Sequence, residues 1–118
     1  MYQKENSVTT ISTEQDVLTL VNVFTVAPED QQRLLDVLVE ATEGVMNKLP
    51  GFVSANLHKS LDGNRVTNYA QWRSREDFEA MLEHPDAGVH MSEAARIAVG
   101  FEPHLYEVAF VDESGRQQ

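Results

Sequence analysis

Two asparagines and a tryptophan stand out because their types and positions could hold a flat, oxygen-bearing ligand. Asn68 and Trp72 lie in the segment 66–72, and Asn22 lies in the segment 17–26; both segments have the composition of β-strands. Side chains alternate between the faces of a strand, so Asn68 and Trp72 share one face. Amide N–H groups suit a developing oxyanion, and an indole can stack on an aromatic ring. The plainer interpretation is that Asn68 caps a turn and Trp72 closes the core.

The histidines give little indication of a metal site. His58, His84, His90 and His104 form no i,i+4 pair, and we find no nearby carboxylate at a metal-ligand spacing. We therefore expect no metal and no cofactor. His90 is the one histidine that we keep as a possible base in a pocket, since histidine is the commonest general base.

Composition excludes several classes of function. The formal net charge of -10 argues against binding to nucleic acid or to an anionic membrane surface, because both are negatively charged. The absence of cysteine excludes disulfides and thiolate chemistry and is typical of a cytoplasmic protein. No apolar run reaches the ~20 residues of a membrane-spanning helix, and the N-terminus does not resemble a signal peptide.

Periodicity predicts one folded domain at 17–112, preceded by a polar, mobile arm at 1–16 and followed by a polar tail at 113–118. Strands are predicted at 17–26, 52–60, 65–73 and 103–111. Helices are predicted at 28–49, 74–83 and 86–99. An Asp62-Gly63 turn joins the second and third strands, and Ser74 with Asp77 resembles a capping box.

This order of elements predicts a ferredoxin-like α+β sandwich, in which helices cover one face of a four-stranded antiparallel sheet. The first strand is apolar on both faces, and one helix layer covers only one of them. We therefore expect a homodimer in which a second subunit covers the other face. The residues buried between the two subunits would be Val17, Thr19, Val21, Val23, Thr25, Tyr69 and Gln71.

Three motifs make the chain similar to a known family. The turn Pro50-Gly51-Phe52, the strand residues 68–72 (NYAQW) and the helix start Glu76-Asp77-Phe78 resemble the antibiotic biosynthesis monooxygenase family, which has the dimeric α+β-barrel fold. The resemblance implies a cofactor-independent oxygenase that converts an anthrone-type aromatic, as in polyketide pathways, to a quinone with O2. It also implies that Asn68 and Trp72 line the pocket, together with Asn22.

The resemblance further implies a basic residue on the last helix, for which His90 and Arg96 are the candidates. Without a metal or flavin, the substrate anion itself must reduce dioxygen, so the protein must bind a flat aromatic and exclude bulk water. We expect apolar side chains to form the walls of the pocket. The candidates are Phe24, Phe52, Leu57, Phe78, Met81 and Met91.

Two other functions remain open at this point. Heme-degrading monooxygenases share the fold and an asparagine like Asn22, and they bind heme as their substrate through a histidine that His90 could supply. They also have a tryptophan on the preceding helix, where this chain has Met81. The second alternative is a non-catalytic dimer that binds a small ligand.

Overall fold

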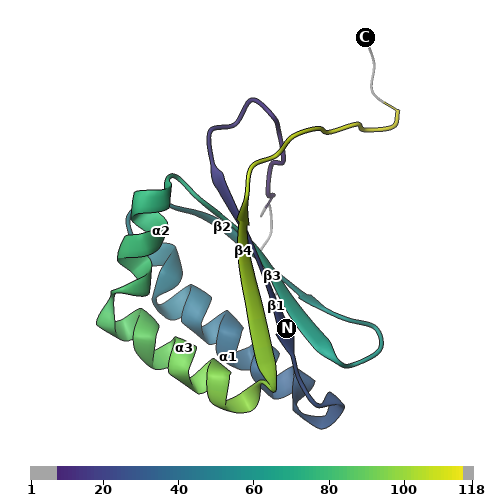
Figure 1. The fold of residues 1–118 in the computed structure, drawn as a ribbon, viewed down its shortest axis with the longest axis vertical. Coiled ribbons are helices and arrows are strands. Elements are labelled where there is room, and N and C mark those ends of the chain that lie inside the picture. Colours follow the sequence, from purple (N-terminus) through teal and green to yellow (C-terminus); the bar gives the residue numbers. More distant parts are fainter. Residues whose placement is uncertain (1–7, 116–118) are drawn as a thin grey trace.

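The protein, described here for residues 8–115 by a computed structural model, has one antiparallel sheet with three helices on one of its faces (Figure 1). The sheet order is β2-β3-β1-β4, so β1 and β3 are the central strands. The strands are β1 (Leu18–Thr25), β2 (Phe52–Lys59), β3 (Arg65–Trp72) and β4 (Gly100–Tyr106). The helices are α1 (Gln31–Gly44), α2 (Arg75–Leu82) and α3 (Pro85–Ile97), with the 3-10 turns η1 (Pro28–Asp30) and η2 (Met46–Lys48). The predicted ferredoxin-like α+β fold is confirmed.

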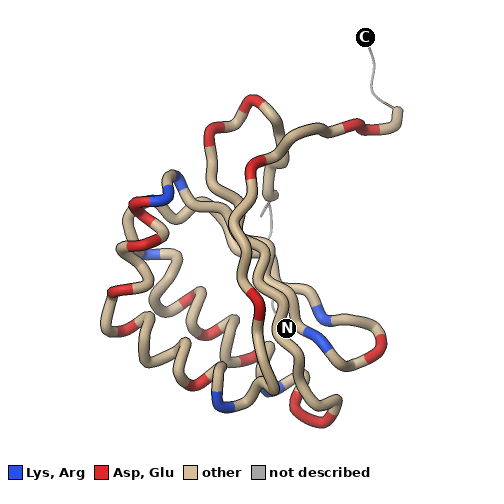
Figure 2. The backbone as a smooth tube through the Cα atoms, in the orientation of Figure 1, with Lys and Arg blue, Asp and Glu red and all other residues tan. Residues whose placement is uncertain are grey.

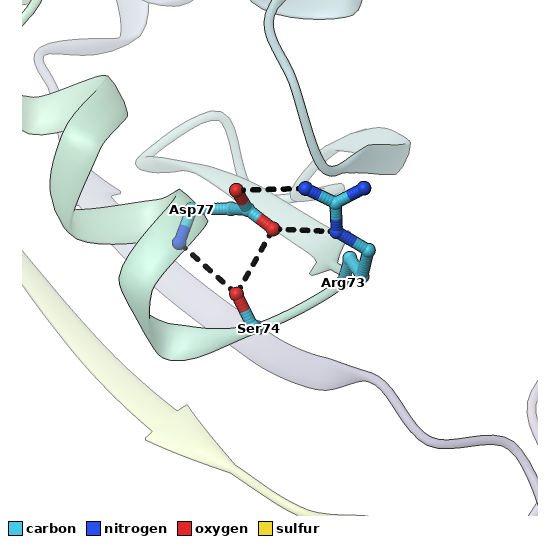
Figure 3. Close-up of polar contacts among 3 residues, drawn as sticks. All are labelled: Arg73, Ser74 and Asp77. Atoms are coloured by element: carbon cyan, nitrogen blue, oxygen red, sulfur yellow. Dashed lines mark hydrogen bonds and ion pairs between the residues drawn. The ribbon is translucent and has the colours of Figure 1, made fainter.

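The turn before β2 packs against the start of α2 at Asp77. Figure 3 shows the contacts of Asp77 with Arg73 and Ser74. Ser74 caps α2, since its Oγ accepts a hydrogen bond from the Asp77 amide at 3.1 Å. The Asp77 carboxylate in turn binds Arg73, with Oδ2 2.7 Å from Nε and Oδ1 3.0 Å from Nη2. The Arg73 guanidinium, and then the Ser74 hydroxyl, hold the pKa of Asp77 below its usual 3.8. Gly51 has φ +84°, and the side chain of Asp77 occupies the space that a Cβ there would need.

The last strand differs from its predicted bounds of 103–111. It begins at Gly100, immediately after α3, because the Val99 amide donates to the Thr25 carbonyl at 2.7 Å and starts the pairing with β1. It ends at Tyr106, which pairs with Thr19 near the start of β1. The length of β1 therefore sets the length of β4. Residues 107–111 continue away from the body as an extended segment in which Phe110 is 81% exposed (Figure 1).

The first predicted helix, 28–49, is divided into η1, α1 and η2. The polypeptide leaves the α-helical conformation at Val45, which has φ -130°. The apolar stripe of α1 packs on the sheet as expected from its helical spacing. Its buried residues include Leu34, Leu35, Leu38 and Ala41.

The outer face of the sheet, away from the helices, is partly covered by the N-terminal arm. Thr9 Oγ1 donates to Asn56 Oδ1 at 2.6 Å, and Gln71 Nε2 donates to the Thr10 carbonyl at 2.8 Å. Gln71 is only 1% exposed, and Thr19 is also buried. Part of the predicted mobile arm is thus hydrogen-bonded to the sheet, and its mobility stays a prediction. Residues 1–7 lie outside the described part.

Acidic residues occur along all three helices, in keeping with the net charge of -10 (Figure 2). None of the helices within residues 8–115 combines the length and the apolar character that a membrane span requires. The cytoplasmic location stays a prediction.

Candidate functional site

Two amides lie side by side at the centre of the sheet. Asn22 on β1 and Asn68 on β3 are direct partners in the antiparallel register, so their Cα atoms are roughly 5 Å apart. Both point toward the helices, because they share a face with the buried side chains of Leu20 and Ala70. The Oδ1 atoms of both asparagines are buried, and neither has a hydrogen-bond partner within residues 8–115.

A cavity of about 580 Å³ lies over these amides, between the sheet and the helices. Small side chains on three elements leave this space open: Ala41 on α1, Ala55 on β2 and Ala70 on β3 all line it. Phe101, Pro103 and Leu105 of the edge strand β4 bound one side, and Phe101 is half exposed. The lining is mainly apolar with a few polar groups, which is the usual character of a small-molecule site.

Three aromatic side chains close the end of the cavity near α2. Trp72 is buried, and its ring lies edge-on to Phe52 with centroids 5.6 Å apart and an interplanar angle of 90°. Phe78 packs on the same indole, with ring centroids 6.5 Å apart and an interplanar angle of 66°. The locked turn at Gly51 and the Ser74 cap position these two phenylalanines, because the first follows the turn directly and the second lies on the first turns of α2.

Most of the predicted wall residues come together in this cavity. Besides Asn22, Asn68 and Trp72, it is lined by Phe24, Phe52, Phe78, Met81 and Met91. Three predicted site residues do not line it: Leu57, His90 and Arg96.

Each of these three residues lies outside the cavity because of where its side chain packs. Leu57 lies opposite Asn68 on β2 but packs with the leucines of the first half of α1, in a second core cluster. Arg96 is exposed near the end of α3. His90 is half-buried on α3 beside Met91, whose side chain takes the position facing the cavity. The heme alternative required a histidine like His90 in the pocket, so this geometry does not support it.

Sequence reasoning missed several lining residues. Arg75 lines the cavity from the first turn of α2, and its Nε lies 3.2 Å from Glu79 Oε2. Thr42 also lines it, but its hydroxyl already donates to the Leu38 carbonyl at 2.9 Å. The contributions of β4 followed from no motif, and Phe101 lay outside the predicted strand at 103–111. Among the described lining residues there is no carboxylate; the ionisable ones are Arg75, which is paired with Glu79, and His104.

Comparison with known proteins identifies the family. Residues 17–92 match the family described as "Antibiotic biosynthesis monooxygenase". The chain is 56% identical over 81 residues to tetracenomycin-F1 monooxygenase of Streptomyces glaucescens. The aligned residues make up 69% of this chain and 72% of that protein.

Solved structures share the fold. The monooxygenase ActVA-Orf6 of Streptomyces coelicolor, in complex with Nanaomycin D, matches with a TM-score of 0.78 at 23% identity over 86% of this chain and 95% of that one. SnoaB of Streptomyces nogalater, a cofactor-independent oxygenase, matches with a TM-score of 0.64 at 26% identity, over 86% of this chain and 99% of that one. The family match spans most of the predicted domain and includes Asn22, Asn68 and Trp72. Together with the 56% identity, it establishes that the chain belongs to the antibiotic biosynthesis monooxygenase family and is a monooxygenase.

Proposed function

We propose that the protein oxidises a polycyclic aromatic, phenolic substrate of the anthrone type to a quinone with O2 and without a cofactor. The observation that carries this proposal is the pair of adjacent amides, Asn22 and Asn68, which line an otherwise mainly apolar cavity. The names of the relatives support the substrate class, since one acts on tetracenomycin F1 and another binds Nanaomycin D.

The amides can serve the substrate in both of its protonation states. Each Oδ1 accepts a hydrogen bond from a phenolic O–H in the bound substrate. Each Nδ2 donates to the phenolate oxygen once the proton has left, and this favours the anion over the neutral form. Because both amides lie on the central strands, they are held rigidly and need little reorganisation as the charge develops.

The cavity has the length that a fused ring system needs. Asn68 and Trp72 are four residues apart on β3, which places them about 13 Å apart at ~3.3 Å per residue. Ala70 lies between them and leaves a flat floor. A fused aromatic can therefore place one oxygen at the amides while its far end meets the aromatic wall of Phe52, Trp72 and Phe78.

The reaction balances without an external reductant. The delocalised substrate anion gives one electron to O2, and the two radicals combine to form a C–O bond at the ring carbon. The peroxide anion takes up the proton that the substrate lost. The hydroperoxide then loses water, formed from its terminal O–H and the remaining hydrogen of that carbon, and the O–O bond breaks. One oxygen atom ends in the quinone and the other in water. The protein binds the anion and limits access of bulk water to the radical pair.

We also infer that the protein works as a homodimer. Val21 and Val23 on the outer face of β1 are only half-buried, and Thr19 Oγ1 is buried there without a partner within residues 8–115. A second copy on this face would bury the remaining apolar surface. Light scattering should give twice the chain mass of 13.3 kDa, whereas a mass of 13.3 kDa at micromolar concentration would contradict the inference.

Turnover of an anthrone tests the catalytic proposal. Dithranol oxidation, followed by O2 uptake and quinone absorbance, should be faster than the uncatalysed reaction with the wild type. It should fall by roughly 10²-fold in Asn68→Ala, the usual scale for one lost oxyanion donor. Asn47→Ala is the matched control, since Asn47 is exposed on η2.

The variants must be compared as folded proteins, so their melting temperatures and masses are measured first. An Asn68→Ala variant that is folded and oxidises dithranol at the wild-type rate would show that the amides are structural. Removal of both Asn22 and Asn68 should lower the rate of dithranol oxidation by less than the product of the two single effects, because both amides act on one charge.

A further inference from the structure

Three metal-ligating side chains converge between two helices, outside the cavity. Glu40 on α1 and His90 and Glu93 on α3 each offer a ligand atom, and these atoms all lie within 4.8 Å of one another. His90 and Glu93 are one helical turn apart, so they project from the same face of α3. Glu40 is fifty positions before His90 in the chain, and only the packing of α1 against α3 brings it to them.

The three side chains have no other partners in the described part of the chain. The Nδ1 atom of His90 is buried and accepts or donates no hydrogen bond there. Neither glutamate forms an ion pair, although Arg96 lies one turn after Glu93 on the exposed side of α3. Two carboxylates this close repel each other, and a cation between them would turn the repulsion into attraction. The cluster therefore combines a histidine, one nitrogen of which is buried and unpartnered, with uncompensated negative charge.

We propose that Glu40, His90 and Glu93 form a binding site for a divalent cation of the zinc type. An imidazole nitrogen with two carboxylate oxygens is a donor set typical of Zn²⁺ and of the neighbouring transition metals. Ca²⁺ and Mg²⁺ favour all-oxygen shells with more ligands, so the histidine selects against them. Water would complete the coordination on the exposed side, where Glu40 lies.

The position of the site indicates a role in holding the helix layer together. Both helices contribute to the cavity, α1 through Ala41 and Thr42 and α3 through Met91. None of the three ligands lines the cavity, so the ion would not touch the substrate. It would instead fix the two helices relative to each other behind the cavity wall. This role is independent of the oxidation proposed above.

Titration of the tag-free protein with Zn²⁺, and with Co²⁺ as a spectroscopic probe, tests the site. Calorimetry should give one ion per chain, and bound Co²⁺ should develop visible absorption bands. Zn²⁺ should also raise the melting temperature, since a ligand that binds only the folded state stabilises it. His90→Ala, Glu93→Gln and Glu40→Gln should each weaken binding by about tenfold or more, because loss of outer-shell groups alone costs about that much.

Two matched variants complete the test. Glu43→Gln removes an exposed glutamate one turn from Glu40 and should leave binding unchanged. Glu102→Gln removes the acid that lies 2.8 Å from His104 on β4 and controls for stray binding there. The proposal is wrong if the wild type binds no Zn²⁺, if the three ligand variants bind as well as the wild type, or if Glu102→Gln alone loses the ion. Should His90→Ala fail to fold, Glu40→Gln carries the test, since Glu40 is exposed.

Discussion

Replacing Asn22 by leucine should make the protein more stable while it removes activity. The side chain is 6% exposed, lies among apolar neighbours, and its buried Oδ1 has no hydrogen-bond partner within residues 8–115. An unsatisfied buried polar group costs about 1 to 3 kcal/mol, and leucine has the same branched arrangement of side-chain heavy atoms as asparagine. The free energy of unfolding should therefore rise by about 1 to 3 kcal/mol. For a chain of this length that corresponds to a rise of roughly 4 °C in melting temperature per kcal/mol.

Asn56→Leu is the control with the opposite expected sign. Asn56 lies on the outer face of the same sheet, where its Nδ2 donates to the Tyr69 carbonyl at 2.9 Å and its Oδ1 accepts from Thr9. Leucine there should lower the free energy of unfolding by about 1 to 3 kcal/mol, because it leaves both partners unpaired.

The assays are chemical denaturation and dithranol turnover on the same preparations. The prediction requires that Asn22→Leu gain stability and lose about 10²-fold in turnover, the scale of a lost oxyanion donor. A loss of stability in Asn22→Leu comparable to that of Asn56→Leu would refute the reasoning. It would mean that the Asn22 amide is satisfied in the folded protein and serves the structure.

Three further perturbations have clear expected outcomes. Gly51→Ala should destabilise the protein by about 1 to 3 kcal/mol in urea denaturation, because alanine is strained at φ +84° and would collide with Asp77; an unchanged midpoint would contradict this. The pKa of Asp77 is lowered in the folded protein, so its stabilising effect is present above pH 3.8 and is lost as the pH falls through the lowered pKa. The difference in unfolding free energy between wild type and Asp77→Asn should therefore shrink as the pH falls below 3.8. A difference that stays constant down to pH 2 would contradict this prediction. Deletion of residues 1–13 should lower the melting temperature measurably, because Gln71 loses its bond to Thr10, and an unchanged value would show that this docking adds nothing.

The sequence was sufficient to place the central residues of the candidate site on one face of the sheet, because that placement depends on local geometry. Alternation along a strand places Asn68 and Trp72 on one face, and the ferredoxin-like order makes their strand a neighbour of the strand with Asn22. Alternation does not decide the register between the two strands, because a slip of two residues leaves every side chain on its face. The pairing of Asn22 with Asn68 is therefore seen only in the structure. The Ser74 cap was also readable, since it depends on residues three positions apart.

The parts that were missed depend on how the elements pack. Whether His90 or Met91 faces the cavity is decided by a rotation of α3 of about 100°, which one sequence does not fix. The side chain of Leu57 points to the expected face of the sheet, but it packs in the second core cluster and does not line the cavity. Glu93 follows His90 by one turn, and the importance of that spacing emerges only when α1 brings Glu40 beside it.

The three alanines that open the cavity separate the size of the site from its chemistry. Ala41, Ala55 and Ala70 belong to different elements, and none of them carries a group that could activate or bind oxygen. Exchange of one alanine for a larger residue would reshape the space available to the rings and leave both amides in place. Substrate range and reactivity can therefore diverge independently, and these positions are the natural starting points for redesigning the enzyme toward other ring systems.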